Sequence, residues 1–306
     1  LRRYLGRGKG VAVRSFPDLT VDYFRKVHEL EGDYIFILDK PIVSKEFFDE
    51  VEEHNIPVVW IDHHEVQEVP DFVNYYNPLS TGKNNEPVTY LCYKLTEKKD
   101  DAWIAVIGCI FDKFVPDFYP EFEKNYPDLS VKYDDAFDIF YKSPIGKIAK
   151  IFSFGLKDRT TNVVNMLRFL TEVKTPYEVL EETSKNFSMH NRFNQINEKY
   201  QRLMEKAISV GKSSKEILFF QYGGELSISG DLANELNYRF PDKIIVVVYL
   251  SGIKANISAR GKDVRSLILN AIEGLEDSTG GGHSDAVGAK IRVEDIETFR
   301  ERLSGM

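Results

Sequence analysis

Two adjacent histidines, His63 and His64, follow Asp62 at the end of the apolar segment 57–61. Imidazole nitrogens are good ligands for manganese or zinc, and a carboxylate beside a ligating histidine commonly orients the second ring nitrogen. The pattern therefore indicates a metal site. A solvated loop after a buried strand is the competing interpretation, so the assignment needs support from other parts of the chain.

Two further aspartates give that support. Asp39 ends the apolar run 34–38, and Asp112 ends the apolar run 102–111. A carboxylate that is buried without a partner costs free energy. A cation shared at the edge of a sheet would account for all three segments together, whereas either aspartate taken alone could be a helix N-cap or a loop residue.

A third group of polar residues lies near the C-terminal end. Three consecutive glycines, Gly280 to Gly282, precede His283. They predict a loop whose backbone N–H groups can approach an anion closely, with His283 as a further donor. Arg260, at the end of the alternating segment 254–260, is a candidate phosphate partner. A surface turn and an exposed arginine at a strand end are the alternative interpretations.

Strands and helices that alternate are predicted to position these residues. The apolar segments 11–13, 34–38 and 57–61 predict strands, and segments 20–31 and 44–55 predict helices. Apolar strands separated by helices are typical of a parallel sheet with helices on both faces, where ligands bind beyond the carboxyl ends of the strands. Two of the candidate aspartates follow such ends.

After residue 66 the predicted secondary structure is ambiguous, and it becomes regular again toward the C-terminal end. Residues 67–86 read as a polar loop, and the run 102–111 is compatible with a buried helix or a buried strand. Residues 176–210 predict one long polar helix. From residue 217 an α/β alternation returns and continues to residue 303.

Composition sets the outer limits. A chain of 306 residues predicts about two domains, and 42% hydrophobic residues suit an ordinary globular protein. The net charge of −8 counts against a protein that coats duplex DNA, although a local basic groove remains compatible with it. The two cysteines suit a reducing cytoplasm, and neither a membrane-spanning run nor a signal peptide is visible in the sequence.

The combination of segments resembles the DHH phosphoesterase superfamily. The residues that carry the resemblance are Asp39 after YIFIL, Asp62-His63-His64 after PVVWI, Asp112 in GCIFDKF, and Gly280-Gly281-Gly282-His283 in STGGGHSDAVGAKI. The resemblance implies an α/β fold with three parts. These are a parallel-sheet DHH domain with helices on both faces (1–175), a connecting helix (176–212) and a smaller α/β DHH-associated, substrate-binding domain (213–306).

The resemblance also implies roles for the candidate residues. The expected metal ligands are Asp39, which would bridge two manganese ions, His63 and Asp112, with magnesium as an alternative metal. Asp62 would support the site and His64 would contact the scissile phosphate. His283 and its glycines, together with Arg260, would hold the substrate. Two cations ~3.5–4 Å apart can activate a water and stabilise the phosphoryl group during in-line displacement.

One departure from the family pattern leaves two explanations open. The superfamily's first motif, an N-terminal strand with a histidine and two or more aspartates, is not found in the sequence. We expect that the real protein has an N-terminal segment before Leu1, because the sequence starts in the middle of a predicted helix. The alternative is a lineage that became a non-catalytic, Cdc45-like scaffold.

Within the superfamily, the segments GCIFDKF and DKP look most like the archaeal RecJ-like exonucleases, including the Hef-associated type. We therefore predict a manganese-dependent exonuclease on single-stranded DNA or RNA, with a repair or replication helicase as an implied partner and no membrane association. The alternative enzyme is an oligoribonuclease or a phosphodiesterase for cyclic dinucleotides, dinucleotides or nucleotides.

Overall fold

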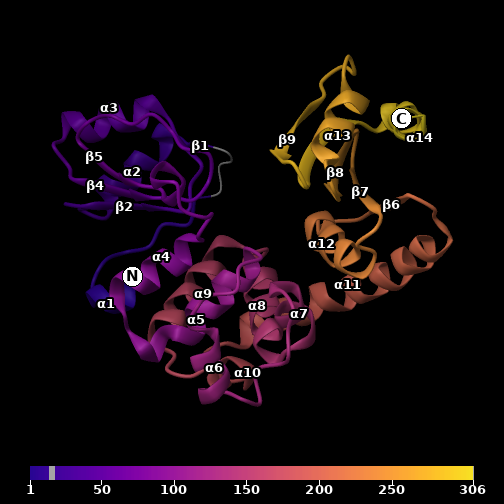
Figure 1. Cartoon of the computed structure of the whole chain (residues 1–306). Helices are drawn as coiled ribbons and strands as arrows, with labels where there is room; N and C mark the ends of the chain where they lie inside the picture. The colour runs from indigo at the N-terminus through magenta and orange to yellow at the C-terminus, as the bar shows by residue number, and fades with distance from the viewer. Residues whose placement is uncertain (14–17, 306) are drawn as a thin grey trace. The chain divides into compact units, whose positions relative to one another are not determined.

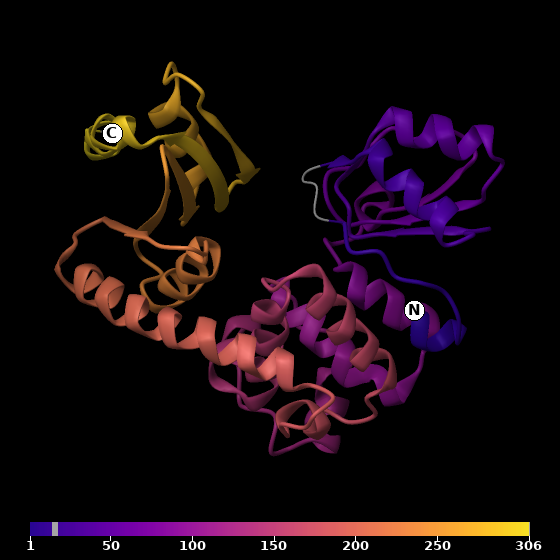
Figure 2. The same ribbon diagram turned by 180° about the vertical axis from the view of Figure 1, so that it is seen from behind.

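The computed structural model describes residues 1–13 and 18–305. The chain divides into two compact units, Leu1–Phe193 and Asn194–Met306. The first unit holds a small parallel sheet and a group of helices, and the second holds a five-stranded sheet with helices on both faces (Figures 1 and 2). The predicted α/β fold class is confirmed.

The parallel sheet of the first unit has the order β2-β4-β5. Its strands are β2 (Ile35–Leu38), β4 (Val58–Ile61) and β5 (Val73–Tyr76). Because the strands are parallel and in register, their carboxyl ends meet at one edge, and the backbone N–H of Asp39 donates to the carbonyl of Ile61 at 3.0 Å. The sequence did not predict β5, since its residues lie within the polar segment 67–86.

Two helices pack against one face of this sheet, as Figure 1 shows. They are α2 (Phe24–Glu29), which follows the 3-10 turn η1 (Val21–Tyr23), and α3 (Lys45–Glu53). Their apolar side chains share a core with Trp60 and the other inward-facing strand residues. Ser44 caps α3, because its hydroxyl accepts a hydrogen bond from the backbone N–H of Phe47 at 3.3 Å.

A second, very short parallel pair lies beside these elements. It consists of β1 (Asp18–Leu19) and β3 (Ile42–Val43). The strand predicted over residues 11–13 is wrong, since these residues form no strand. An apolar triplet therefore did not identify the strand that opens the unit.

The remainder of the first unit is helical. Its elements are α1 (Arg2–Leu5), η2 (Pro78–Thr81), α4 (Val88–Thr96), η3 (Lys99–Asp101), α5 (Ala102–Phe111), α6 (Tyr119–Asn125), α7 (Ala136–Lys142), α8 (Pro144–Gly155), α9 (Thr160–Glu172), α10 (Tyr177–Leu180) and the start of α11 (Phe187–Ser213). The ambiguous run 102–111 is helix α5, and other helices surround it. Trp103, Val106 and Ile110 on α5 are fully buried.

The sheet of the second unit has the order β6-β7-β8-β10-β9, in which β6 and β7 are parallel and the other pairs antiparallel. The strands are β6 (Ile217–Gly223), β7 (Ile244–Ser251), β8 (Lys254–Arg260), β9 (Thr279–His283) and β10 (Ala286–Arg292). Helix α12 (Ser229–Arg239) packs on β7 and β8. On the other face, α13 (Val264–Ile272) and α14 (Ile296–Ser304), which follows η4 (Val293–Asp295), share a core with the strands.

Two further details of the fold differ from the sequence predictions. The three glycines and His283 form edge strand β9 rather than a loop, because they pair antiparallel with β10. The long helix predicted over 176–210 is two helices, α10 and α11. The division between the units falls within α11, after Phe193, and no break in the sequence pattern marks it.

Candidate functional site

The first cluster of interest lies where β2 and β4 end. Nε2 of His63 lies 3.3 Å from Oδ1 of Asp39, and the rings of His63 and His64 are 4.6 Å apart between centroids. One ligating atom from each of these three residues lies within 4.8 Å of the others. The sheet thus brings together side chains that are separated by more than twenty residues in the sequence.

Asp39 has an unusual backbone conformation. Its φ of 57° lies in the left-handed region, which aspartate and asparagine tolerate better than most other residues. Its side chain is 53% exposed, while that of His63 is 13% exposed. The turn after β2 therefore directs a carboxylate toward His63 at the edge of the sheet and leaves it accessible to solvent.

Asp62 orients the ring of His64. Its side chain is fully buried, and its two oxygens accept hydrogen bonds from the ring Nδ1 of His64 at 2.9 Å and from the backbone N–H of the same residue at 2.8 Å. A proton on Nδ1 leaves the lone pair on Nε2, which is the arrangement found in histidines that bind metals. The structure therefore places His64 within a group of three residues that could hold a metal ion, whereas the resemblance assigns it to the scissile phosphate.

A buried residue that sequence analysis missed supports the same turn. Asn77 is 1% exposed, and its amide donates to the carbonyl of His64 and to the hydroxyl of Tyr75, both at 2.9 Å. Its carbonyl accepts from the backbone N–H of Leu79 at 3.0 Å. Recognising β5 in the sequence would have identified Asn77 as the residue that follows a third strand end.

The charges of the cluster are coupled. Burial raises the pKa of Asp112 to about 6, and the nearby Asp39 carboxylate contributes. Burial also opposes ionisation of Asp39, but the hydrogen bond and charge of His63 outweigh it and lower the pKa of Asp39. The same pairing outweighs the burial of His63, so its pKa is raised. Asp112 thus acts on the cluster electrostatically, although it lies outside the group of three close ligating atoms.

The residues present fit a divalent cation. Nδ1 of His63 is buried and has no hydrogen-bond partner among the described residues, while Nε2 faces Asp39. One carboxylate and two imidazoles form a donor set that suits manganese or zinc. The three close ligating atoms are enough to hold one ion, with Asp112 as an additional acidic group. A second ion would need further ligands.

The second group of predicted residues lies on one face of the sheet in the second unit. Arg260 on β8, Ala286 on β10 and His283 on β9 are directly opposite one another, so their side chains share a face. Two residues further along β10, Gly288 lies opposite Gly281 on the same face. We call these positions on β8, β10 and β9 the open face. Helix α12 covers the β8 side of this face, where it contacts Ser258 and Arg260, so the uncovered part lies on β10 and β9; the reverse side of the sheet is packed against α13.

The glycines of the open face differ from their neighbours. A Cβ on Gly280 would lie 2.8 Å from Ile272, and Gly282 has a φ of 139° with space for a Cβ blocked by the carbonyl of Ala286. Neither constraint applies to Gly281 or Gly288, where a Cβ would meet nothing within 4 Å. Glycine inside a strand is destabilising and often marks close approach of a ligand.

Arg260 is held in place beside these glycines. Its Nε donates to Oδ1 of Asn234 on α12 at 2.6 Å, and its Nη1 donates to the carbonyl of Ala259 at 2.8 Å. His283, at the end of β9, is exposed. A fixed guanidinium and an exposed imidazole in register on one face can bind phosphate groups.

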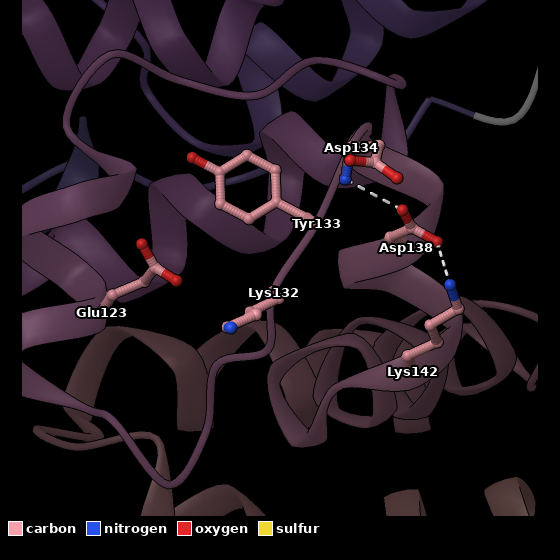
Figure 3. A pocket seen from close by; sticks show the side chains of 6 residues that line it. All are labelled: Glu123, Lys132, Tyr133, Asp134, Asp138 and Lys142. Carbon is pink, nitrogen blue, oxygen red and sulfur yellow. Dashed lines mark hydrogen bonds and ion pairs between the residues drawn. The ribbon is translucent and has the colours of Figure 1, made fainter.

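A pocket of about 420 Å³ in the first unit contains none of the predicted site residues (Figure 3). Its walls combine the acidic and basic side chains of Glu123, Lys132, Tyr133, Asp134, Asp138 and Lys142. Within it, Asp138 pairs with Lys142 and accepts from the backbone N–H of Asp134 at 2.9 Å. The side chains of Asp138 and Lys142 are therefore engaged with each other.

Comparison by sequence identifies the second unit. The DHHA1 domain family matches residues 214–305, which include the whole open face. No curated protein matches the chain. No helix among the described residues is long and apolar enough to cross a membrane.

Comparison with solved structures extends over both units. RecJ from Thermus thermophilus in complex with manganese is similar with a TM-score of 0.62 and 15% identity, over 93% of this chain and 46% of RecJ. An exonuclease RecJ bound to manganese gives 0.59 and 16%, over 98% of this chain and 80% of the other. A DHH domain from a member of a family of ribosomal proteins gives 0.57 and 16%, over 96% and 75%. The chain thus spans about half the length of the Thermus protein.

Proposed function

We propose that the chain is a phosphoesterase of the DHH superfamily, a divalent-metal-dependent phosphodiester hydrolase that acts on single-stranded DNA or RNA. The observation that carries the proposal is the convergence of Asp39, His63 and His64 at the carboxyl edge of the parallel sheet. Manganese is the proposed metal, since its ligand preferences match these side chains and two of the similar structures contain it.

In this proposal, the residues of the first unit have different roles in binding the cation. Asp39, His63 and His64 would hold a cation, which would lower the pKa of a water molecule and neutralise charge on the phosphate. Asp62 fixes the tautomer of His64 through the hydrogen bond to Nδ1. Asp112, whose pKa is raised to about 6, is ionised above that pH and would add negative charge for the cation.

The residues of the second unit would bind the substrate. Arg260 and His283 offer cationic and hydrogen-bonding groups for phosphate, and Gly281 with Gly288 leaves the backbone uncovered so that a nucleotide can approach it. The free cysteines, Cys92 and Cys109, suit a reducing compartment, and we assign the protein to the cytoplasm on that basis.

A second candidate function is a non-catalytic scaffold, of which a repair helicase would be the natural partner. It is favoured by exposed apolar side chains on the face of the parallel sheet opposite α2 and α3. There Phe36 is 40% exposed, and Leu38 and Tyr76 are each 39% exposed. Large exposed apolar side chains that gather on one face often mark interaction sites.

The experiment that separates these functions measures turnover of a labelled single-stranded oligonucleotide and of a dinucleotide, with manganese, by the wild-type chain and by His63→Ala. Degradation of the long strand by the wild type alone supports the exonuclease. Cleavage of the dinucleotide alone supports a small-substrate phosphodiesterase. Absence of manganese binding and of both activities supports the scaffold and contradicts the proposal.

A further inference from the structure

The open face continues beyond the glycines to a second cationic position. Lys290 lies on β10 two residues after Gly288, and it is opposite Asn256 on β8 and Thr279 on β9. Since side chains two residues apart in a strand point to the same side, Lys290 shares the face of Arg260 and His283. The face therefore runs from a cationic row, across bare glycines, to a polar row that contains a lysine.

The electrostatic setting of this face differs from that of the whole chain. The protein has a net charge of −8, yet strands β8, β9 and β10 contain no aspartate or glutamate. The hydrogen bond and charge of Arg292 contribute most to the lowered pKa of Asp277, and the charge of Lys290 contributes less. Asp277 accepts from Arg292 at 2.7 Å and Glu276 pairs with the same arginine at 2.7 Å, while Lys290 forms no ion pair with the described residues.

The separation between the two cationic positions exceeds the size of one phosphate group. Ala286, which stands in the row of Arg260 and His283, is four residues from Lys290 along β10. At about 3.4 Å per residue, the two rows are roughly 14 Å apart. Arg260 is held in its row by the hydrogen bond to Asn234, so a strand that lies along β10 would present one phosphate to Arg260 and a later phosphate to Lys290.

From this arrangement, which rests on the proposed function, we infer that Lys290 is a length-determining residue that binds a second phosphate of a nucleic acid strand. A mononucleotide or dinucleotide fills only the row of Arg260 and His283. A longer strand crosses Gly281 and Gly288 and reaches Lys290. The protein thus favours oligonucleotides over dinucleotides by the affinity that this one contact adds.

The test measures binding of labelled single-stranded oligonucleotides of two to eight nucleotides by fluorescence anisotropy, with EDTA present so that no hydrolysis occurs. The proteins are the wild type, Lys290→Ala, Lys290→Arg and the control Lys206→Ala, which removes an exposed lysine of α11. We expect Lys290→Ala to weaken binding of strands of four or more nucleotides by about 5- to 10-fold and of dinucleotides by less than about 2-fold. Lys290→Arg should retain the preference, and Lys206→Ala should bind like the wild type.

Salt dependence gives a second readout. Loss of one phosphate contact should reduce the slope of log affinity against log salt for the long strands by about 0.7. Equal weakening at every length, or no weakening while the wild type still binds long strands, overturns the role of Lys290 and leaves the proposed function standing. Failure of the wild type to bind any oligonucleotide overturns both.

Discussion

The two candidate regions prepare for ligands in opposite ways. At the end of the parallel sheet, the chain gathers groups whose charges interact strongly, so that burial and the Asp39 carboxylate raise the pKa of Asp112 to about 6. On the open face of the second unit, the chain removes side chains, and Gly281 and Gly288 face empty space. A candidate cation site is therefore recognised by charged side chains that lie close together. A candidate surface for a nucleic acid strand is recognised by positions where side chains are absent.

Replacing His63 by Ala should impair the first region more than any other single change. It removes one of the imidazoles proposed to bind the cation, and we expect hydrolysis to fall by roughly 10³-fold or more, because a bound cation contributes several kcal/mol to such reactions. Turnover and manganese binding by calorimetry check this. The control is His54→Ala, which removes an exposed histidine of the same unit. Equal activity of the two variants would remove His63 from the site.

Substitution of Asp62 by Asn tests orientation rather than ligation. The buried carboxylate accepts from Nδ1 and from the backbone N–H of His64, and an amide cannot accept both with the same geometry. We expect metal affinity or activity to fall about 10- to 100-fold. Asp71→Asn, at an exposed position, is the control. Wild-type metal affinity in Asp62→Asn would show that the ring of His64 needs no such partner.

Glycine substitutions test the open face of the second unit. Val at position 281 or 288 should weaken oligonucleotide binding by roughly tenfold through steric blockage, while the folded state is unchanged or more stable, because valine suits strands. Gly282→Ala should instead destabilise the second unit by about 1–3 kcal/mol, since its φ is 139°. Binding and denaturant unfolding are measured on all three variants. Normal binding by the valine variants would contradict the ligand surface.

A more modest change is expected in the metal-free protein. The pKa of Asp112 is raised from 3.8 to about 6, so its carboxyl favours folding fully only below the unfolded value, and this contribution is lost as the pH rises through about 6. Asp112→Asn should therefore raise the melting temperature at pH 7–8 by on the order of 2–4 °C, after allowance for solvent screening, and leave it unchanged at pH 4. The same variant should bind manganese more weakly. A lower melting temperature at pH 7 would show that Asp112 is stabilising without metal.

The sequence predicted those parts of the fold and site that follow from apolar periodicity. Strands β2 and β4 end where their apolar runs end, so the positions of Asp39 and Asp62 were visible in advance. Strand β5 was not, because its residues Val73–Tyr76 include exposed and polar side chains, and Asn77 was missed with it. Apolar periodicity also gave no information on strand pairing. For that reason the register that aligns Gly288 with Gly281, and Lys290 with Thr279, could be read only from the structure.

The left-handed backbone of Asp39 has a consequence for how the protein can vary. A residue at this position must meet two requirements: its backbone must adopt a φ near 57°, and its side chain must supply a carboxylate. Glycine and asparagine tolerate the left-handed backbone conformation but lack the carboxylate. Glutamate keeps the carboxylate, but the left-handed conformation is unfavourable for it. In a saturation library, stability and activity at position 39 should therefore rank the substitutions in different orders. Few substitutions at position 39 would therefore preserve both stability and activity, and a protein that had lost the carboxylate would regain the site only through a return to aspartate.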